Sequence, residues 1–420
     1  MSVQHRNDVS TSFASASDNS VVGPSVTTLP DRRTALWLRR LNLTAFRCYR
    51  SATLETDARP VVLTGPNGAG KTNLLEAISL LAPGRGLRRA RLAEIQRRSP
   101  QENAPTGWAV AAEVVTRDGA RALGTGADPA AAGNDNGRER RLVKIDGAFA
   151  RSQQALGEIV SAVWLTPQMD GLFREGASAR RRFLDRLVYA FDIAHAGRVA
   201  SYEHAMRERG RLLKGATLKG SGPEPAWLAA LEETMAGRAV AIAAARREMT
   251  ARLADACAAG VGPFPRAGLG LVGDIESWLA EMPAVDAEDR LRDALAESRA
   301  RDAESGRAAQ GPHRSDLAVR HLEKDQPAEL CSTGEQKALL ISVVLAHARL
   351  LALDRASAPL PLLDEIAAHL DEDRRRALFA EILELGLQAW MTGTDAELFR
   401  SLDDGAQVFE VEDATLRRVT

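Results

Sequence analysis

The chain has 420 residues and a mass of 45.2 kDa, more than one hydrophobic core usually holds, so its length predicts two or three domains. A composition of 45% hydrophobic and 26% charged residues excludes collagen-like, mucin-like and wholly disordered proteins. The 55 basic and 56 acidic residues give a net charge of −1, so any surface that attracts nucleic acid must be local.

The cysteines and the most apolar stretch indicate the compartment. Cys48, Cys257 and Cys331 lie far apart and fit neither a disulfide framework nor a zinc-ligand pattern, which is typical of a reducing compartment. The stretch Leu339 to Leu353 is interrupted by a histidine and an arginine, and we expect it to be too polar and too short to span a bilayer. We therefore expect a cytoplasmic protein with no membrane segment.

The N-terminal part of the chain is predicted to be a tail followed by an α/β unit. Residues 1–34 have no periodic apolar pattern, and we expect a mobile tail. Residues 35–172 are predicted to form the first part of the head, with a flexible loop over the whole segment between Val115 and Arg141, which includes Gly133–Gly137. Its predicted elements are strands at 36–43, 52–55 and 60–64, a helix at 71–81, and antiparallel strands at 108–115 and 141–145.

The rest of the chain is predicted to be a helical insertion followed by more of the α/β unit. Residues 173–300 form a mainly helical lobe, with helical spacing from Ala177 to Ala259 and a long helix after Pro225, but no heptad run of coiled-coil length. Residues 301–420 complete the head. Their predicted elements are a helix at 335–353, a strand at 360–363, a helix at 373–385 that stops at Gly386, and a strand at 388–392.

The strongest chemical signal is a phosphate-loop motif between an apolar strand and a helix. Glycines let successive backbone N–H groups point into one concavity, and the helix N-terminus adds a positive dipole end. In this motif Lys71 reaches the β- and γ-phosphates and Thr72 binds Mg²⁺. The predicted ATP-binding residues here are Gly65, Pro66, Asn67, Gly68, Ala69, Gly70, Lys71, Thr72 and Asn73.

A second signal is the apolar run Leu360-Pro361-Leu362-Leu363, which ends in Asp364 and Glu365. Apolar strands often end in acids for solubility alone, but a phosphate site needs Mg²⁺ and the cation needs a carboxylate besides Thr72. We therefore expect Asp364 near the metal and Glu365 near the attacking water. Asp371 follows at a helix start, where an N-cap is the plainer interpretation.

A third signal is Ser332-Thr333-Gly334-Glu335-Gln336-Lys337 at the start of an apolar helix. The spacing of Ser332 and Glu335 fits a capping box. The same helix N-terminus could also serve as an anion site for a nucleotide held by a second subunit. The two interpretations are compatible.

Together these segments resemble the ATP-binding-cassette ATPases and, more narrowly, the RecF family of recombination mediators. The resemblance covers nearly everything after the tail. Its most diagnostic strings are Arg180 to Asp185, Tyr202 to Lys214 and Gly311 to Leu317, and Leu41 to Arg50 resembles the family's opening strand and Phe-Arg turn. The implied fold is an α/β, ABC-type (SMC/RecF-like) P-loop ATPase head with a helical second lobe.

The resemblance also assigns roles. It implies ATP and Mg²⁺ as cofactors, with Lys71 and Glu365 as catalytic residues and Thr72, Asp364 and Gln168 at the metal. Across a dimer, Ser332, Gly334 and Gln336 would contact the γ-phosphate, with Asp371 in the interface loop and Thr394 at the switch that senses the γ-phosphate. The chain departs from the family where it has Glu335 in the signature segment and Asp364-Glu365 in place of two aspartates.

Two groups of arginines are candidates for DNA contact, although a solvated charged face explains them equally well. A basic face built from both groups would bind the DNA backbone in a salt-sensitive and sequence-independent manner. The candidates are Arg85, Arg88, Arg89, Arg91, Arg180, Arg181 and Arg182.

The resemblance implies a weak DNA-dependent ATPase that dimerises on ATP, binds double-stranded DNA near gaps and helps to load RecA with RecR and RecO. Three alternatives come from other classes: the nucleotide-binding subunit of a membrane transporter, a chromosome protein of the structural-maintenance type, and an ATP-dependent scaffold that hardly hydrolyses. The long insertion argues against the first and the missing heptad arms against the second. The third stays open.

Overall fold

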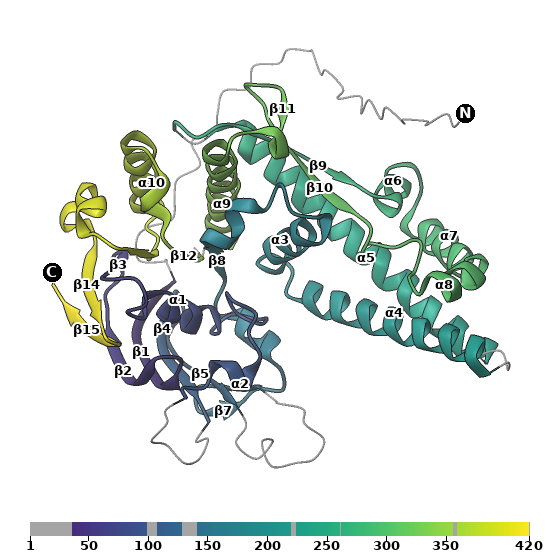
Figure 1. Cartoon of the computed structure of the whole chain (residues 1–420), viewed down its shortest axis with the longest axis horizontal. Coiled ribbons are helices and arrows are strands. Elements are labelled where there is room, and N and C mark those ends of the chain that lie inside the picture. The colour runs from purple at the N-terminus through teal and green to yellow at the C-terminus, as the bar shows by residue number, and fades with distance from the viewer. Residues whose placement is uncertain are drawn as a thin grey trace.

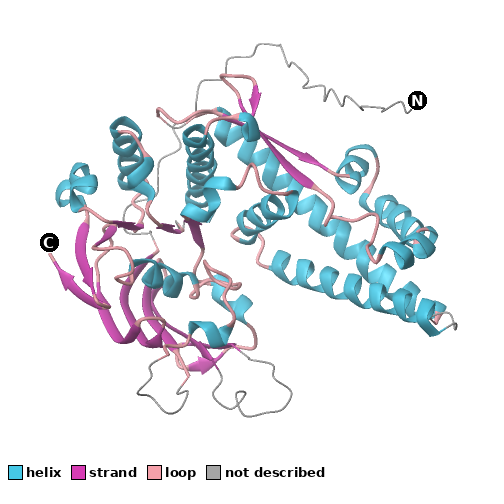
Figure 2. Ribbon diagram, in the orientation of Figure 1, coloured by secondary structure: helices cyan, strands magenta, loops and turns pink. Residues whose placement is uncertain are grey.

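The computed structural model describes residues 36–98, 107–127, 141–219, 224–260, 262–355 and 359–419. The predicted tail and the loop at Gly133–Gly137 lie outside these residues. The chain forms a two-sheet head on the left of Figure 1 and a helical lobe on the right. Figure 2 shows the same division, with strands gathered in the head.

The first sheet of the head is antiparallel and has the strand order β2-β1-β4-β5-β6-β7. Along β1 the buried residues Leu38, Leu41 and Leu43 break strict alternation, because the pairing with β4 shifts between Leu38 and Arg40. The strands are β1 (Trp37–Phe46), β2 (Tyr49–Glu55), β4 (Ala109–Thr116), β5 (Gly119–Ala127), β6 (Arg141–Ile145) and β7 (Ala148–Phe149).

The second sheet has the order β15-β14-β3-β13-β12-β8, and only β15 runs antiparallel to its neighbour. The four residues of β3 are all buried, as expected for a parallel strand covered on both faces. The strands are β3 (Val61–Thr64), β8 (Ala162–Leu165), β12 (Leu360–Leu363), β13 (Trp390–Gly393), β14 (Gln407–Glu412) and β15 (Thr415–Arg418).

Two apolar cores lie on opposite faces of the second sheet. On one face Val61 and Leu63 pack with β1 and with α1 (Lys71–Ser79), next to the short α2 (Leu92–Ile95). On the other face Val62 packs with α9 (Thr333–Arg355) and α10 (Glu372–Glu384). Figure 1 shows these layers, with α1 between the sheets and α9 and α10 on the far side.

The helical lobe contains six helices and a small three-stranded sheet, ordered β11-β10-β9, among the described residues. The longest helices, α4 and α5, pack along one another. The elements are α3 (Ala177–Tyr189), α4 (Ala194–Lys219), α5 (Pro225–Ala258), β9 (Ala267–Val272), α6 (Asp274–Glu281), α7 (Ala284–Glu297), α8 (Arg299–Ser305), β10 (Asp316–His321) and β11 (Gln326–Pro327).

Buried ion pairs hold this lobe together. Arg209 on α4 donates to Glu232 on α5 at 2.9 Å and to Asp302 on α8 at 2.8 Å, and all three side chains are at most 2% exposed. Nearer the head, Arg246 on α5 donates to both oxygens of Asp185 on α3, at 2.8 and 2.9 Å. These arginines cross-link the helices of the lobe beside its apolar core, which includes Val240, Trp278 and Leu291.

Several predictions about the fold are corrected. The segment after 115 was predicted as loop, but β5 occupies 119–127; its glycines and alanines have weak strand propensity, and pairing with β4 and β6 outweighs it. The boundary at residue 300 cuts α8, and β9 of the lobe pairs with β10 of the predicted C-terminal part. The predictions of α1, α5, α10 and the stop at Gly386, which has a φ of 63°, agree with the structure.

The apolar helix α9 is longer than predicted. Its segment Thr333–Asp354 is long and apolar enough to span a membrane, which the predicted stretch was not, and 83% of its most apolar window is buried in the fold. No other helix in the described ranges meets the same criterion. Burial on this scale is the property of a core helix, and α9 packs against α5, β8 and β9.

Candidate nucleotide-binding site

The phosphate loop, residues 65–72, connects β3 to α1, as the sequence predicts. Gly65 has a φ of +137°, and a Cβ atom there would lie 2.1 Å from the Val411 carbonyl oxygen. Gly70 has a φ of +117°, and its Cβ would lie 2.6 Å from the Tyr49 hydroxyl. Only glycine fits these two positions, and the free N–H groups at the start of α1 face the space that phosphates would fill.

Lys71 folds back across the loop. Its Nζ atom donates to the carbonyl oxygens of Gly65 at 2.7 Å and Pro66 at 2.9 Å, and lies 3.9 Å from Glu365 Oε1. Burial lowers the pKa of Lys71, and the nearby Glu365 and Asp364 carboxylates partly oppose this shift. The ammonium group is thus held inside the loop by weak carbonyl acceptors, which an anionic phosphate can replace.

Asp364 lies at the centre of a hydroxyl–carboxylate cluster. The Thr72 hydroxyl donates to its Oδ1 at 2.9 Å, and the Thr392 hydroxyl donates to the same oxygen at 2.8 Å. The backbone N–H of Glu365 in turn donates to the Thr392 hydroxyl at 2.8 Å. Hydroxyl and carboxylate oxygens are the donors that Mg²⁺ prefers, so Thr72 and Asp364 fit this cation.

The cluster forms because three parallel strands end at the same edge of the sheet. The loop after β3, Asp364 after β12 and Thr392 on β13 meet there, where ligands of open α/β sheets bind. Sequence analysis missed Thr392. The feature that could have indicated Thr392 is a hydroxyl residue at the end of the apolar strand Trp390–Gly393, which runs parallel to the strand that precedes Asp364.

Glu365 has an unusual backbone conformation. Its φ of 50° and ψ of 32° are left-handed, which costs a non-glycine residue free energy that the surrounding fold must supply. Its side chain is 25% exposed and lies beside Lys71. A carboxylate held in this way at the mouth of a phosphate site is suited to binding a water molecule.

The predicted signature segment has a mixed outcome. Ser332 and Glu335 form the predicted capping box: the Ser332 N–H donates to Glu335 Oε2 at 3.0 Å and the Glu335 N–H donates to Ser332 Oγ at 3.4 Å. Hydrogen bonds from Lys324 and then from Ser332 lower the pKa of Glu335 to about 2. Ser332 and Gly334 are exposed at the start of α9.

Gln336 is buried, unlike Ser332 and Gly334. This side chain is 1% exposed and donates to the carbonyl oxygens of Cys331 at 2.8 Å and Glu329 at 3.3 Å. It therefore shapes the turn before α9, and its contact with a nucleotide on another subunit stays a prediction. The position one residue earlier, Glu335, lies on the outer side of the helix start because one residue turns a helix by 100°.

The remaining candidates lie around this centre. Gln168 is exposed in the 3₁₀ turn Pro167–Gly171, and Asp170 of that turn forms an ion pair with Lys337 of α9 at 3.5 Å. Asp371 caps α10 by accepting from the Arg374 N–H at 2.9 Å. Thr394 is exposed just beyond β13. The ion pair therefore joins the Gln168 turn to the signature helix.

The candidate DNA-binding arginines separate into two kinds. Arg180 forms a two-point ion pair with Asp316, Arg181 donates to the Ser315 carbonyl, and Arg88 binds Asn73 and Glu76, so these three hold the fold together. Arg85, Arg89 and Arg91 form the other kind; they are exposed, as is Arg88. Arg182, which donates to Ser178, and Arg85 both lie close enough to Arg89 to help lower its pKa, after the larger effect of burial.

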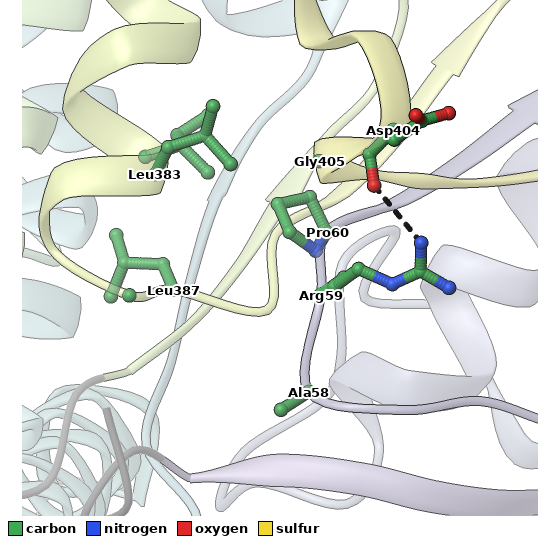
Figure 3. Close-up of a pocket in the computed structure, with 9 residues that line it drawn as sticks. Ala58, Arg59, Pro60, Leu383, Leu387, Asp404 and Gly405 are labelled. Carbon is green, nitrogen blue, oxygen red and sulfur yellow. Dashed lines mark hydrogen bonds between the residues drawn. The ribbon is translucent and has the colours of Figure 1, made fainter.

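A separate cavity of about 380 Å³ lies at the opposite end of β3. Figure 3 shows Pro60 and Leu383 on its walls and Arg59 donating to the Asp404 carbonyl oxygen at 3.0 Å. It lies at the amino end of the strand, whereas the phosphate loop follows the carboxyl end. This cavity is therefore not part of the nucleotide site.

The fold and the site define an ATPase head of the ATP-binding-cassette type. Residues 37–417 match the family model described as RecF/RecN/SMC N terminal domain. The DNA replication and repair protein RecF of Allorhizobium ampelinum is 50% identical over 382 residues, which cover 90% of this chain and 98% of that protein. The protein of the same name from Mesorhizobium japonicum is 50% identical over 381 residues, covering 90% and 97%. The chain belongs to the RecF family.

Solved structures agree at the level of the fold. The recombination mediator protein RecF-ATPrS in the RecFOR pathway superposes with a TM-score of 0.77 at 21% identity, covering 92% of this chain and 99% of that one. An Smc head domain derived from Pyrococcus furiosus gives a TM-score of 0.50 at 15% identity, covering 91% and 96%. The predicted ABC-type head with a helical second lobe is confirmed.

Proposed function

We propose that this chain is an ATP-dependent, DNA-binding recombination mediator that closes into a dimer around two ATP molecules. The proposal rests on one observation: the predicted nucleotide-binding residues lie in two separate places on the chain. Lys71, Thr72 and Asp364 converge at one sheet edge, while Ser332 and Gly334 stand exposed at the start of a different helix. An exposed helix N-terminus supplies free N–H groups, and a second copy would bring them to the γ-phosphate.

The chain's own residues account for binding and for the positioning of water. Lys71 exchanges two carbonyl acceptors for phosphate oxygens, and Thr72 and Asp364 hold Mg²⁺, which supplies positive charge against the phosphates when bound. Glu365 accepts a hydrogen bond from the attacking water and orients it. Gln168 and Thr394 would sense the bound γ-phosphate, so that hydrolysis would loosen the dimer.

The biological task rests on the relatives. The curated relatives are DNA replication and repair proteins, and the superposed structure comes from the RecFOR pathway. We propose weak DNA-dependent ATP hydrolysis in the cytoplasm and binding to double-stranded DNA at gaps. With RecR and RecO, the dimer would assist RecA loading. The DNA contact would use the exposed arginines of the head, Arg85, Arg89 and Arg91.

Mixing two defective variants tests the composite site. Lys71→Ala removes the phosphate lysine of a protomer, and Ser332→Arg blocks the surface that it presents to a partner. Each variant alone should stay monomeric with ATP, but an equal mixture should form dimers with one intact site. Mass in solution with ATP, ADP and no nucleotide measures this. If every sample stays monomeric under all three conditions, the unmodified chain included, the proposed dimer around ATP is wrong.

The scaffold alternative has its own test. Glu365→Gln keeps the size and removes the carboxylate that orients water, so it should prolong the ATP-bound dimer and reduce turnover at least tenfold. If turnover is negligible before and after the change, the chain acts as a scaffold.

Duplex binding by the Arg85→Ala/Arg89→Ala/Arg91→Ala variant tests the DNA contact of the head. Unchanged affinity would exclude these arginines from the contact.

A further inference from the structure

A basic groove lies on the helical lobe, away from the nucleotide site. Its walls are the C-terminal half of α4 and the segment 306–314 that follows α8, and it encloses about 460 Å³. Figure 1 shows α4 and α8 together at the end of the lobe that is farther from the head. The exposed cations that line the groove are Arg207, Arg211, Lys214, Arg307 and Arg314.

The acid that lines the groove is already neutralised. Asp302 accepts from Arg209 at 2.8 Å, from the Ser298 hydroxyl at 2.8 Å and from the Ala309 N–H at 3.1 Å. On the α4 wall, Arg207 and Arg211 have solvent-accessible partners on their own helix, Glu203 and Glu208, and such surface pairs contribute little. The groove therefore presents more positive charge than its own acids cancel.

Three of the cations have no such partner. Among the residues that the structure describes, no carboxylate lies within ion-pair distance of Lys214, Arg307 or Arg314. Like charges gathered around a concave surface repel one another, and a polyanion that fills the groove removes this cost. The chemistry of the groove thus points to a ligand with repeated negative charge.

The spacing of the cations fits a phosphodiester backbone. Arg207, Arg211 and Lys214 follow one face of α4 at i, i+4 and i+7, which is about 10 Å along the helix axis. One strand of duplex DNA carries a charge every ~3.4 Å along its axis, so this wall faces about three phosphates. Among the lining residues of the groove, the ring of His313 is already stacked on Tyr202 and shares a hydrogen bond with the Tyr202 hydroxyl at 2.7 Å. The lining residues therefore offer no free aromatic side chain on which single-stranded bases could stack.

We propose that this groove, the α4 groove, is a second contact surface for the sugar–phosphate backbone of double-stranded DNA. The proposal rests on the DNA binding proposed above and extends it from the head to the helical lobe.

The test neutralises the three unpaired cations together. The variant Lys214→Gln/Arg307→Gln/Arg314→Gln removes three charges and keeps polar side chains. Its control, Arg117→Gln/Arg400→Gln/Arg417→Gln, removes the same charge from exposed sites in the head. Fluorescence anisotropy with a labelled 30-base-pair duplex over a range of salt concentrations gives the affinity and its salt slope. Melting temperature checks that each variant is folded.

We expect the groove variant to bind the duplex about tenfold or more weakly than the control and to reduce the salt slope by about three units, one for each phosphate that the variant no longer binds. A slope equal to that of the control overturns the proposal. If the variant instead loses affinity for a poly-glutamate peptide and not for duplex, the groove binds acidic protein and the DNA assignment is wrong.

Failure of this inference is distinguishable from failure of the proposed function. If the Arg85/Arg89/Arg91 variant loses duplex binding while the groove variant keeps it, the function stands and the groove proposal falls. If the unmodified chain with ATP binds no duplex at low salt, both fall.

Discussion

The head and the helical lobe both bury a carboxylate, and the two are neutralised differently. In the lobe, Asp185 is 5% exposed and accepts from Arg246 at 2.8 and 2.9 Å and from His195 at 2.8 Å. In the head, Asp364 is 7% exposed, but it accepts from the hydroxyls of Thr72 and Thr392. Within the described ranges, no arginine or lysine nitrogen lies at ion-pair distance from Asp364.

The difference separates a structural carboxylate from a functional one. Burial alone would raise the pKa of Asp185, but its hydrogen bonds to His195 and Arg246 outweigh this and hold the pKa below its usual value. Its negative charge is neutralised inside the fold. Asp364 has neutral donors that orient it and leave its charge for a cation. A buried acid without a basic partner is therefore the better indicator of a ligand site.

The largest expected effect comes from neutralising Asp185. Asp185→Asn leaves Arg246 buried without its counterion, and breaking a buried pair from one side costs about 3–5 kcal/mol. We expect the free energy of unfolding in urea to fall by this amount. A loss below about 1 kcal/mol would show that solvent reaches the pair and that the lobe does not depend on it.

Asp364→Asn is the matched control in the head. The amide oxygen still accepts from Thr72 and Thr392, so the free energy of unfolding without nucleotide should change by less than about 1 kcal/mol. The extra stability that MgATP gives by binding should be lost. If Asp364→Asn unfolds the chain as strongly as Asp185→Asn does, the distinction between the two carboxylates fails.

The sequence predicted the parts of the site that depend on local spacing. The phosphate loop, the two acids after an apolar strand and the capping box at Ser332 are each defined within eight residues. Thr392 was missed because its role depends on the order of strands that are distant in sequence. The burial of Gln336 was not predicted, because a shift of one residue at a helix start exchanges the buried and the exposed side.

The helical lobe was predicted only in outline for a related reason. Its two long helices were recognised by their apolar spacing, but nothing in the sequence distinguishes Arg209 or Arg246 from the other basic residues on exposed faces. Their partners lie 23 to 93 residues away along the chain. Burial of a charge is a property of the assembled lobe, and local pattern does not encode it.

His347 gives the next largest effect, because it joins the two regions. It lies on α9, and its Nε2 atom donates to the Leu187 carbonyl oxygen on α3 at 2.9 Å. Burial lowers its pKa from 6.5 to about 4. Between these values the unfolded chain binds a proton that the folded chain excludes, so stability falls as the pH drops from about 6.5 to about 4, by on the order of 3 kcal/mol.

His347→Gln keeps a donor for Leu187 and cannot titrate in this range. Melting temperatures measured from pH 7.5 to pH 4 should therefore decline less steeply in this variant than in the unmodified chain. Parallel curves for the two proteins would mean that His347 takes up its proton in the folded state, and that the junction between head and lobe is open to solvent.

Thr392→Val tests whether the hydroxyl relay positions the acids of the head. The variant keeps the shape of the side chain but removes one hydrogen bond to Asp364 and the acceptor for the Glu365 N–H, which together cost about 1–2 kcal/mol. We expect kcat to fall about tenfold or more with little change in the KM for ATP, and Thr392→Ser to restore most of it. A raised KM with unchanged kcat would place Thr392 in nucleotide binding instead.

The smallest effect is expected at Asp371, where two roles can be separated by the choice of substitution. Asp371→Ala removes the N-cap of α10 and should lower the free energy of unfolding of the monomer by about 1 kcal/mol. Asp371→Asn keeps the cap and removes only the charge, so the monomer should keep its stability. If Asp371→Asn also forms the ATP-dependent dimer normally, the residue is a cap alone. If the dimer weakens while the monomer melts as before, the carboxylate acts at the interface, and its exposed ion pair with Arg374 at 3.5 Å leaves it accessible to a partner.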